Sequence, residues 1–383
     1  MTNQRDIIEI QSNELVWQLR DRAHAYFPQL SGREPRVQLV DQRVRWNSVL
    51  CAFVVSTDAG DRRLQVKLPR RRLSDSAAEN GAVKPRPRLF PLPDSDGKSE
   101  LEYSTLSRIH DHFAKLNDPR FGAMRVLDYL PENRALVMEH VPHPSLSRVL
   151  MRCCRPAIRS SNTDGVVRNA GSWLRIYHQL PGLTHTRDRH ETRADFLRSF
   201  TEFADYLAVA CRNAPWVESV ATGAASLADS VLPEFLPMGM SHGDYAPRNI
   251  FVGAGERVIV FDTLARWRAP IYEDIAHFLI ALKLARPQVY SLGLAFGASF
   301  LARQEREFLR GYFGDETIPI PAIRLFEKLV LMDKWASLLH QYQGSTGIFR
   351  LARLGLLSVW SRPIRRLLEQ PAPQELQAGV QAS

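Results

Sequence analysis

Cysteine is scarce in this chain and is spaced for neither a zinc site nor a redox pair. The 383 residues include four cysteines, Cys51, Cys153, Cys154 and Cys211, and no C-x-x-C spacing occurs among them. Adjacent cysteines such as Cys153 and Cys154 are badly placed to bridge each other. This usage excludes the disulfide-rich secreted class and favours reduced thiols in a cytoplasmic protein.

Long apolar segments are also lacking. The first ten residues, MTNQRDIIEI, contain acidic side chains and no apolar core of the kind that a secretory signal has. An uncharged run over residues 287–301 is too short and too rich in Gly and Ser to cross a bilayer. We therefore expect a soluble, cytoplasmic chain.

Composition excludes a wholly disordered or fibrous chain. Hydrophobic residues make up 45% and charged residues 24%, as in ordinary globular proteins, and the length suits two lobes. The formal net charge of +9 suits an anionic ligand such as a nucleotide, but equally nucleic acid or an acidic membrane surface. Basic residues crowd two segments, 67–88 and 362–366, where a solvated basic face is an equally good interpretation.

Predicted strands are concentrated in the first part of the chain. In order, hydrophobic patterns predict a helix over 12–27, strands over 36–39, 49–57 and 63–68, a helix over 98–116, and strands over 124–130 and 135–141. Leu64, Val66 and Leu68 alternate with Gln65 and Lys67. This alternation predicts an antiparallel hairpin with one apolar face and Lys67 on the other face.

The rest of the chain has mostly helical patterns. Helices are predicted over 166–180 and 190–231 and onward to about Glu369, with one strand–turn–strand unit over 238–262. An α+β fold follows, with a small antiparallel-sheet N-lobe and a larger, mostly helical C-lobe. The expected division is a helical extension (1–35), an N-lobe (36–140) with a flexible, proline-rich insertion at 70–98, a C-lobe (141–370) and a disordered tail (371–383).

The strongest chemical signal is the segment His242-Gly243-Asp244-Tyr245-Ala246-Pro247-Arg248-Asn249, which leads into the apolar residues 250–252. A second apolar strand, 258–261, ends at Asp262 after a hairpin turn. Asp244 and Asn249 would then lie on the loop before one strand, close to Asp262 at the end of the neighbouring strand. An alternative is that Asp244 caps a turn and Asp262 simply ends a strand.

Phosphoryl transfer needs such a convergence of oxygen-bearing side chains. One carboxylate must accept the proton of the attacking hydroxyl, and hard oxygen ligands must hold Mg²⁺ against the phosphates. An Asp followed five residues later by an Asn has the spacing of a kinase catalytic loop. In that interpretation Asp244 is the base, Asn249 is a metal ligand, and Asp262 is the second metal ligand.

The order of three motifs resembles the aminoglycoside phosphotransferase and choline kinase-like superfamily. These motifs are His-Gly-Asp-x-x-x-x-Asn, then Asp262 at the end of a strand, then Glu273-Asp274-Ile275-Ala276 at the start of a helix. The resemblance covers about residues 36–345. It implies a protein-kinase-like two-lobed fold, ATP and Mg²⁺ as cofactors, and transfer of the γ-phosphate to a hydroxyl of a small molecule such as a sugar, amino alcohol, glycoside or lipid-linked acceptor. By this resemblance His242 supports the loop, and Asp274 is structural, either capping its helix or tying down the loop.

The N-lobe of such a kinase supplies a strand lysine for the α- and β-phosphates and a helix glutamate that pairs with it. Lys67 suits the lysine, although it could be a plain surface residue. Glu102 suits the glutamate because it aligns with Leu106 and Ile109 on an apolar stripe, where a carboxylate needs a cationic partner. Glu102 could instead only complement the helix dipole, and Glu100 remains the other candidate.

Nucleotide contacts are expected at two further places. The loop expected to cover the phosphates, 43–48, has no glycine, so it lacks easy access to positive φ, although Arg45, Asn47 and Ser48 can donate hydrogen bonds. The lobe-connecting strand 135–141 should offer its backbone near Glu139 and Val141 to adenine, but an ordinary buried strand would have the same sequence.

Two other kinds of function stay open. The glycine-free loop and Thr263-Leu264, where the superfamily often has aromatic and acidic residues, would suit a catalytically weak nucleotide-binding scaffold, or pseudokinase. The basic, apolar segment 349–357 would suit a peripheral membrane contact, or else a core-packed helix with exposed arginines. Nucleic acid is the less favoured partner.

The acceptor region has few acidic clusters, which favours a neutral or anionic acceptor over a polycationic one. Sequence leaves the acceptor, the choice between ATP and GTP, and the oligomeric state unassigned.

Overall fold

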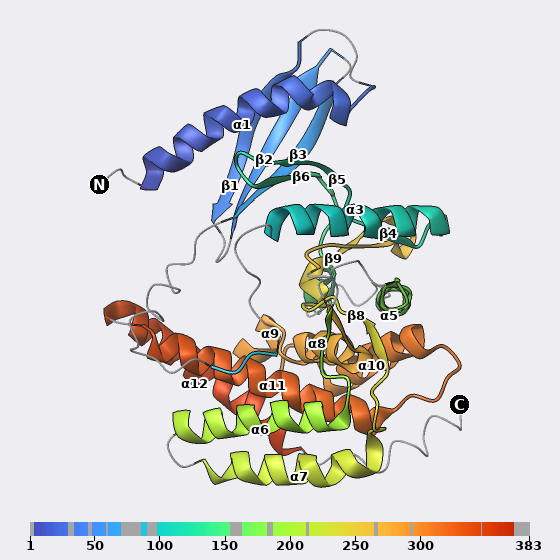
Figure 1. The fold of residues 1–383 in the computed structure, drawn as a ribbon, viewed down its shortest axis with the longest axis vertical. Coiled ribbons are helices and arrows are strands. Elements are labelled where there is room, and N and C mark those ends of the chain that lie inside the picture. Colours follow the sequence, from blue (N-terminus) through green and yellow to red (C-terminus); the bar gives the residue numbers. More distant parts are fainter. Residues whose placement is uncertain are drawn as a thin grey trace. The chain divides into compact units, whose positions relative to one another are not determined.

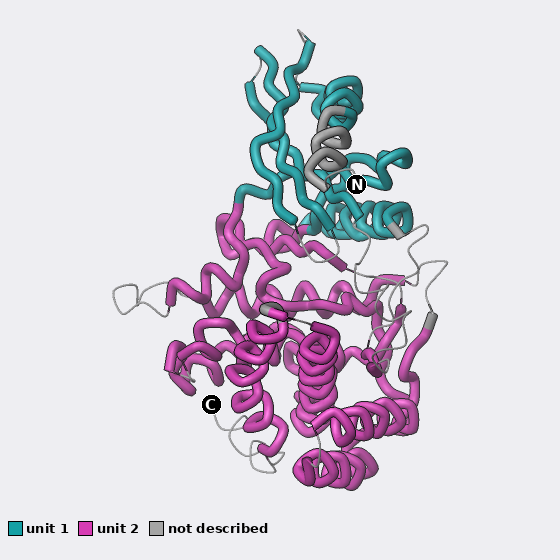
Figure 2. The backbone as a smooth tube through the Cα atoms, turned by 90° about the vertical axis from the view of Figure 1, so that its left-hand side faces the viewer, with its two compact units in different colours: residues 1–73, 93–117, 123–142 teal, residues 74–92, 118–122, 143–383 magenta. Residues whose placement is uncertain are grey.

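The structure is a computed structural model that describes residues 4–29, 34–44, 48–58, 60–69, 86–89, 98–153, 163–181, 187–211, 214–263, 267–291, 294–345 and 347–370. The chain divides into two compact units (Figure 2). Unit 1 comprises residues 1–73, 93–117 and 123–142, and unit 2 comprises residues 74–92, 118–122 and 143–383. The expected disordered tail lies outside the described residues.

Unit 1 is built on an antiparallel sheet. Its elements are α1 (Gln4–Tyr26), β1 (Arg36–Val44), β2 (Ser48–Thr57), β3 (Gly60–Pro69), α3 (Lys98–Leu116), β5 (Val126–Leu130) and β6 (Ala135–Glu139). The strand order is β1-β2-β3-β6-β5, and every neighbouring pair is antiparallel. In the β2–β3 hairpin, Ser48 lies opposite Pro69 and Thr57 opposite Gly60. The predicted N-terminal antiparallel sheet is therefore confirmed.

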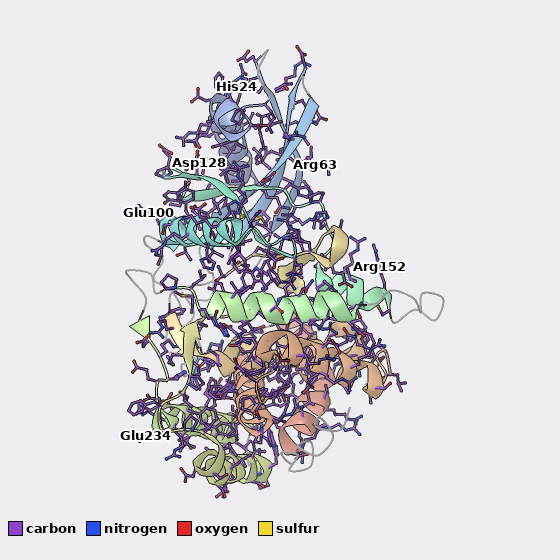
Figure 3. All side chains as sticks on the ribbon, turned by 90° about the vertical axis from the view of Figure 1, so that its right-hand side faces the viewer. His24, Arg63, Glu100, Asp128, Arg152 and Glu234 are labelled. Atoms are coloured by element: carbon purple, nitrogen blue, oxygen red, sulfur yellow. The ribbon has the colours of Figure 1, made fainter. Side chains whose placement is uncertain are left out.

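Helix α1 lies along the strands of this sheet (Figure 1). Its side chains Leu15 and Leu19 are fully buried in a cluster with apolar residues of β2 and β3. Near its end, Arg22 Nη1 and Tyr26 OH donate to Asp128 Oδ2 of β5 at 2.8 and 2.6 Å; Asp128 is labelled in Figure 3. The segment expected as a helical extension thus forms part of the core of unit 1.

Unit 2 is mostly helical. Its helices are α4 (Leu146–Arg152), α5 (Asp164–His178), α6 (Arg193–Ala210), α7 (Pro215–Val231), α8 (Ile271–Lys283), α9 (Arg286–Tyr290), α10 (Ala298–Phe313), α11 (Ile320–Gln343) and α12 (Gly347–Glu369). The long helix expected over 190–231 is two helices, α6 and α7. Pro215 occupies the first turn of α7, where proline starts a helix readily but cannot continue one from before.

Short strands join these helices. They are β4 (Phe121–Ala123), β7 (Arg187–Asp188), β8 (Met238–Met240), β9 (Ile250–Val252), β10 (Val258–Val260) and β11 (Trp267–Pro270). They form two small sheets, in the orders β4-β10-β9 and β7-β11-β8. The single-turn helices η1 (Pro247–Asn249) and η2 (Ala254–Glu256) flank β9. The predicted strand–turn–strand unit is the β9–β10 ribbon.

Residues 86–89 belong to unit 2, although the sequence predicts residues 70–98 as an insertion of the N-lobe. Arg86 Nη1 donates to Asp333 Oδ1 of α11 at 2.8 Å, and Leu89 is buried. This buried side chain and the ion pair attach the segment to α11. The rest of the expected insertion, apart from the start of α3, lies outside the described residues.

Helix α12 carries the segment considered for membrane contact. Leu351 and Leu354 are 69% and 46% exposed, whereas Ile364 and Leu368 near its end are fully buried. Among the described residues, none of the helices has the length and apolar character needed to cross a bilayer. Peripheral contact through the exposed leucines stays a prediction.

Helices α5 and α10 approach each other closely because glycines lie at their contact. A Cβ at Gly171 would lie 2.1 Å from the Phe308 carbonyl oxygen, and a Cβ at Gly311 would lie 1.9 Å from that of Arg168. Ser172 Oγ also donates to the Gly311 carbonyl at 2.9 Å. The backbones are therefore in contact at these positions, which leaves no room for a side chain.

We predict that Gly171→Ala lowers the free energy of unfolding by about 3 kcal/mol, because the added methyl group must push two helix backbones apart. Gly223→Ala in α7 is the matched control, since a Cβ there meets no atom within 4 Å. Gly223→Ala should raise the free energy of unfolding by about 0.5–1 kcal/mol, because alanine favours the helical conformation more than glycine does. Urea denaturation monitored by tryptophan fluorescence measures both, and equal effects would contradict the proposed contact.

Candidate active site

The loop from Ser241 to Asn249 joins β8 to β9 and carries the His-Gly-Asp motif. Gly243 has a φ of 79°, in the left-handed region that glycine adopts most readily. Tyr245 is fully buried, and its hydroxyl donates to the Ala170 carbonyl of α5 at 2.7 Å. A glycine turn and a buried aromatic anchor therefore fix the backbone on both sides of Asp244.

Asp274 of α8 holds the start of this loop. Its Oδ2 accepts the His242 N–H at 2.6 Å, and its Oδ1 accepts the Gly243 N–H at 2.9 Å. His178 Nε2 lies 3.2 Å from Asp274 Oδ2, and His178 Nδ1 lies 2.7 Å from the Tyr312 hydroxyl. Asp274 is therefore bonded to the backbone of the loop, and His178 is a buried histidine that contacts it.

Asp274 stays ionised in spite of its burial. Burial opposes the charged form, but the hydrogen bond and charge of His178, together with His242, hold the pKa of Asp274 below its ordinary value. A lowered carboxyl pKa adds stability at neutral pH, and this contribution is lost as the pH falls through the folded-state pKa.

Asp244 lies between Asn249 and Arg248. Asn249 Nδ2 donates to the Asp244 carbonyl oxygen at 2.9 Å and to Asp244 Oδ2 at 3.1 Å. Arg248 Nη2 pairs with Asp244 Oδ1. The Asp244 side chain is 36% exposed, so a solute can reach it. Because Asn249 uses Nδ2 in both bonds, its amide oxygen is the atom that could bind a cation.

Asp262 follows the neighbouring strand. Val260 pairs with Ile250 across the antiparallel ribbon, and the Phe261 N–H donates to the Asn249 carbonyl at 3.2 Å. Asp262 is exposed and has a φ of 62°, which Asp tolerates better than most residues. The pairing of β9 with β10 therefore brings Asn249 and Asp262 to the same end of the ribbon.

His242 is a buried imidazole surrounded by carboxylates. It has no exposed surface, and its ring lies edge-on to Tyr245 at 5.2 Å between centroids. Burial lowers the pKa of His242, although the charges of Asp274, Asp244 and Asp262 oppose that shift. The imidazole is therefore neutral at pH 7 and packs beneath the loop instead of exchanging protons with solvent.

An aromatic layer supports the loop from α5. The Trp173 ring stacks on Tyr177 at 5.1 Å and on Tyr245 at 5.9 Å, and Trp173 Nε1 donates to the Gly122 carbonyl at 2.8 Å. The Tyr177 hydroxyl lies 2.6 Å from Thr263 Oγ1, directly after Asp262. Sequence indicated only a core helix here. The four-residue spacing of Trp173 and Tyr177, which puts both on one helix face, was the available signal.

In unit 1, Lys67 Nζ donates to Glu102 Oε1 at 2.6 Å. Both side chains are largely buried, at 19% and 10% exposure, whereas Glu100 is exposed. Of the two glutamates considered, Glu102 is therefore the one that pairs with Lys67. The expected phosphate loop is described only in part, because Arg45 and Asn47 lie outside the described residues, while Ser48 is buried at the start of β2.

The backbone expected to contact adenine follows β6. The Glu139 N–H donates to the Arg125 carbonyl at 3.0 Å, and the next N–H, that of His140, donates to the Arg63 carbonyl at 3.2 Å. Val141 lies beyond the end of the strand and is half-buried. Two amides of this segment are therefore already used within the sheet.

The oxygen donors suit a metal ion that arrives with a ligand. Within the described part of the chain, no group of three or more His, Cys, Asp or Glu side chains could hold a metal. Asn249 and Asp262 instead offer one amide and one carboxylate oxygen. Mg²⁺ is commonly bound by one or two protein oxygens, with water and substrate phosphates completing its shell. The residues present fit that arrangement.

A cavity of about 260 Å³ lies elsewhere in unit 2, among α7, α11 and the end of α12. Its lining includes Trp216, Val220, Leu325 and Lys328. None of the residues expected at the active site lines it, so it is not a candidate acceptor pocket.

A model of the phosphotransferase enzyme family matches residues 52–317. The chain belongs to this family. The matched region contains the Lys67–Glu102 pair and the whole loop that carries Asp244. No curated protein sequence matches the chain.

Solved structures of other phosphotransferases share the fold. AMP-bound spectinomycin phosphotransferase is 12% identical with a TM-score of 0.52, covering 92% of this chain and 99% of that one. An ethanolamine kinase of Plasmodium vivax is 13% identical with a TM-score of 0.51, and the match covers 87% of this chain and 83% of that one. A thermostable mutant of an aminoglycoside phosphotransferase is 14% identical with a TM-score of 0.50, and the match covers 88% of this chain and 97% of that one. The predicted kinase-like α+β fold is confirmed: an antiparallel sheet followed by a mostly helical region.

We predict that Asp274→Ala destabilises this phosphotransferase by about 2–4 kcal/mol, because two buried N–H groups lose their acceptor. Asp274→Asn keeps an acceptor oxygen and should therefore lower the free energy of unfolding by less. Asp229→Ala is the control. Asp229 forms a surface ion pair with Arg193 at 3.5 Å, and such a pair contributes at most about 1 kcal/mol to the free energy of unfolding. Chemical denaturation ranks the three variants, and a cost for Asp274→Ala no larger than the control's would argue against the loop-tying role.

Proposed function

We propose that this chain is an ATP- and Mg²⁺-dependent kinase that transfers the γ-phosphate to a hydroxyl of a small molecule. The observation that supports this most is the hydrogen-bonded pair Asp244 and Asn249, with Asp262 on the adjoining strand. In a member of the phosphotransferase family, these three side chains have the types and the order that phosphoryl transfer requires.

Asp244 would act as the base. Asn249 orients its carboxylate through the 3.1 Å bond to Oδ2, while Arg248 holds Oδ1. An acceptor hydroxyl that donates a hydrogen bond to this carboxylate has its oxygen directed at the phosphate. As the new phosphorus–oxygen bond forms, the bond between the γ-phosphorus and its bridging oxygen breaks, ADP leaves with that oxygen, and the hydroxyl proton passes to Asp244. His242, which is buried and neutral, would only support the loop.

Asn249 and Asp262 would hold Mg²⁺ through their side-chain oxygens, and the bound ion would neutralise charge on the phosphates. Lys67, kept in place by Glu102, would clamp the α- and β-phosphates. Arg45, Asn47 and Ser48 would face the phosphates from the loop. The spectinomycin phosphotransferase bound to AMP, which shares the fold, supports an adenine nucleotide as the donor.

Adenine would contact the backbone near Glu139 and Val141. Because the Glu139 N–H is already bonded to Arg125, these contacts would fall to the Glu139 carbonyl and to the backbone of Val141. Backbone recognition of this kind suits an adenine ring, which carries both a donor and an acceptor on one edge.

We predict that Asp244→Asn lowers phosphotransfer about 10²- to 10⁴-fold, because the base is lost while size and hydrogen bonding are kept. Magnesium-dependent ADP release is measured with a panel of sugars, amino alcohols and glycosides. Asp315→Asn, which changes an exposed residue after α10, is the control and should be as active as the parent. Near-normal turnover by Asp244→Asn would refute its role as the base. If the parent protein binds ATP but phosphorylates no acceptor of the panel, that result would favour the pseudokinase alternative.

We predict that Lys67→Met weakens ATP binding by about 10- to 100-fold, which corresponds to one charge-assisted hydrogen bond. Glu102→Gln should weaken binding less, because Lys67 remains but is no longer held by a charge. Lys115→Met removes an exposed lysine of α3 and serves as the control. Calorimetric titration with ATP and Mg²⁺ measures each affinity. An unchanged affinity in Lys67→Met would move the phosphate clamp to another residue.

A further inference from the structure

A chain of hydrogen bonds in unit 2 joins a serine, a histidine and a buried glutamate outside the candidate active site. Ser199 Oγ of α6 lies 2.9 Å from His190 Nε2, and His190 Nδ1 lies 2.8 Å from Glu273 Oε1 of α8. Distances of this size join a serine nucleophile to its base, and the base to the carboxylate that orients it, in serine hydrolases. Neither Ser199 nor His190 has a part in the proposed phosphoryl transfer.

The carboxylate decides how the protons of this chain are arranged. The Glu273 side chain is fully buried, and its Oε2 has no hydrogen-bond partner among the described residues. A carboxylate can only accept a hydrogen bond, so the hydrogen between Glu273 and His190 is on Nδ1. In the neutral ring Nε2 is then an acceptor, and the Ser199 hydroxyl donates to it. Arg189 is a cation beside this carboxylate, and its Nη2 is farther from His190 Nδ1, at 3.4 Å.

The backbone around His190 is held on both sides. Before it, the Arg189 N–H donates to the Arg268 carbonyl of β11 at 3.0 Å; after it, the Leu236 N–H donates to the Glu191 carbonyl at 2.8 Å. His190 itself has a φ of 52°, in the left-handed region that histidine enters more readily than most residues. The imidazole is therefore placed between its two partners by a fixed backbone.

A second chain of the same kind differs in its exposure. Asp274 and His178 lie 3.2 Å apart, and His178 lies 2.7 Å from the Tyr312 hydroxyl, but all three residues are buried. Burial seals that hydroxyl from solvent. The His190 side chain is instead 18% exposed, and Ser199 is half-buried. The serine end of this chain therefore lies near the surface, where a small molecule can approach it.

We propose that Ser199 is a second nucleophile of this protein, which takes the acyl group of small carboxylic esters, with His190 as its base and Glu273 as the residue that positions the imidazole. Ser199 Oγ attacks the carbonyl carbon while its proton passes to His190 Nε2. The bond from that carbon to the alkoxy oxygen then breaks, and the alcohol leaves with the proton. The product is an ester of Ser199, from which water releases the acid by the same steps.

Labelling of the whole chain with a fluorophosphonate tests this proposal. The probe suits the site because a good leaving group lowers the need for oxyanion stabilisation. Ser199 Oγ displaces fluoride at phosphorus, the proton passes to His190, and the stable adduct is located by peptide mass spectrometry. We expect an adduct at Ser199 in the folded protein and none after unfolding in urea. Ser230 of α7 is the internal control and should stay unlabelled, since its hydroxyl donates to the Leu227 carbonyl at 2.9 Å.

Variants separate a reactive serine from a structural one. Ser199→Ala should abolish labelling and unfold at the same urea concentration as the parent. His190→Gln should slow labelling about 10²-fold or more, because the serine loses its base. Glu273→Asp should react faster than Glu273→Gln, since a carboxylate keeps the hydrogen on Nδ1. If Glu273 only filled space, the order would be reversed, because glutamine has the length of glutamate and aspartate does not.

The carboxylic ester itself is tested with p-nitrophenyl acetate, which should leave an acetyl group on Ser199 in the parent and not in His190→Gln. An adduct at another residue, labelling as fast in His190→Gln as in the parent, or no reaction of the folded parent with either probe would overturn the proposal. If the substitutions of His190 and Glu273 prevent folding, the position of the adduct in the parent decides.

This site and the proposed kinase site can fail separately. Asp244→Asn should be labelled at Ser199 as fast as the parent, and Ser199→Ala should release ADP as fast as the parent. Loss of labelling in Asp244→Asn would place the reactive serine in the kinase site and overturn its independence.

Discussion

The loop that carries Asp244 depends on one buried carboxylate, that of Asp274, which accepts hydrogen bonds from the N–H groups of His242 and Gly243. A buried carboxylate is stable only if partners replace its lost hydration. Here His178 of α5 supplies a second partner, and the Tyr312 hydroxyl of α10 lies 2.7 Å from the other nitrogen of that ring. Residues from three helices, α5, α8 and α10, therefore fix the backbone just before Asp244. The position of Asp244, the proposed base, therefore depends on the whole helical unit, which is why a loop with little regular structure can be held rigidly.

Much of this could be predicted because it depends on short-range patterns. The alternation around Lys67 and the helical stripe through Glu102 place the two charges on facing elements, and an apolar stripe leaves a carboxylate few alternatives to a cationic partner. The rest depends on contacts between distant segments. The two roles open to Asp274 differ only in which N–H groups come near it. Arg86 lies among prolines that indicate a loop, and nothing local in the sequence points to its partner Asp333, far along the chain on α11.

The conformation of Asp262 connects the aromatic layer to the proposed metal site. A φ of 62° costs a residue with a side chain roughly 1–2 kcal/mol, somewhat less for Asp, so neighbouring contacts must hold it. Before Asp262, the Phe261 N–H is bonded to the Asn249 carbonyl; after it, Thr263 Oγ1 lies 2.6 Å from the Tyr177 hydroxyl. Because the residues on both sides of Asp262 are held, its backbone loses little further conformational entropy when the side chain binds a cation. Thr263 therefore has a clear physical role here although it departs from the residues common in the superfamily: it fastens the segment after Asp262 to α5, the helix that also anchors Tyr245.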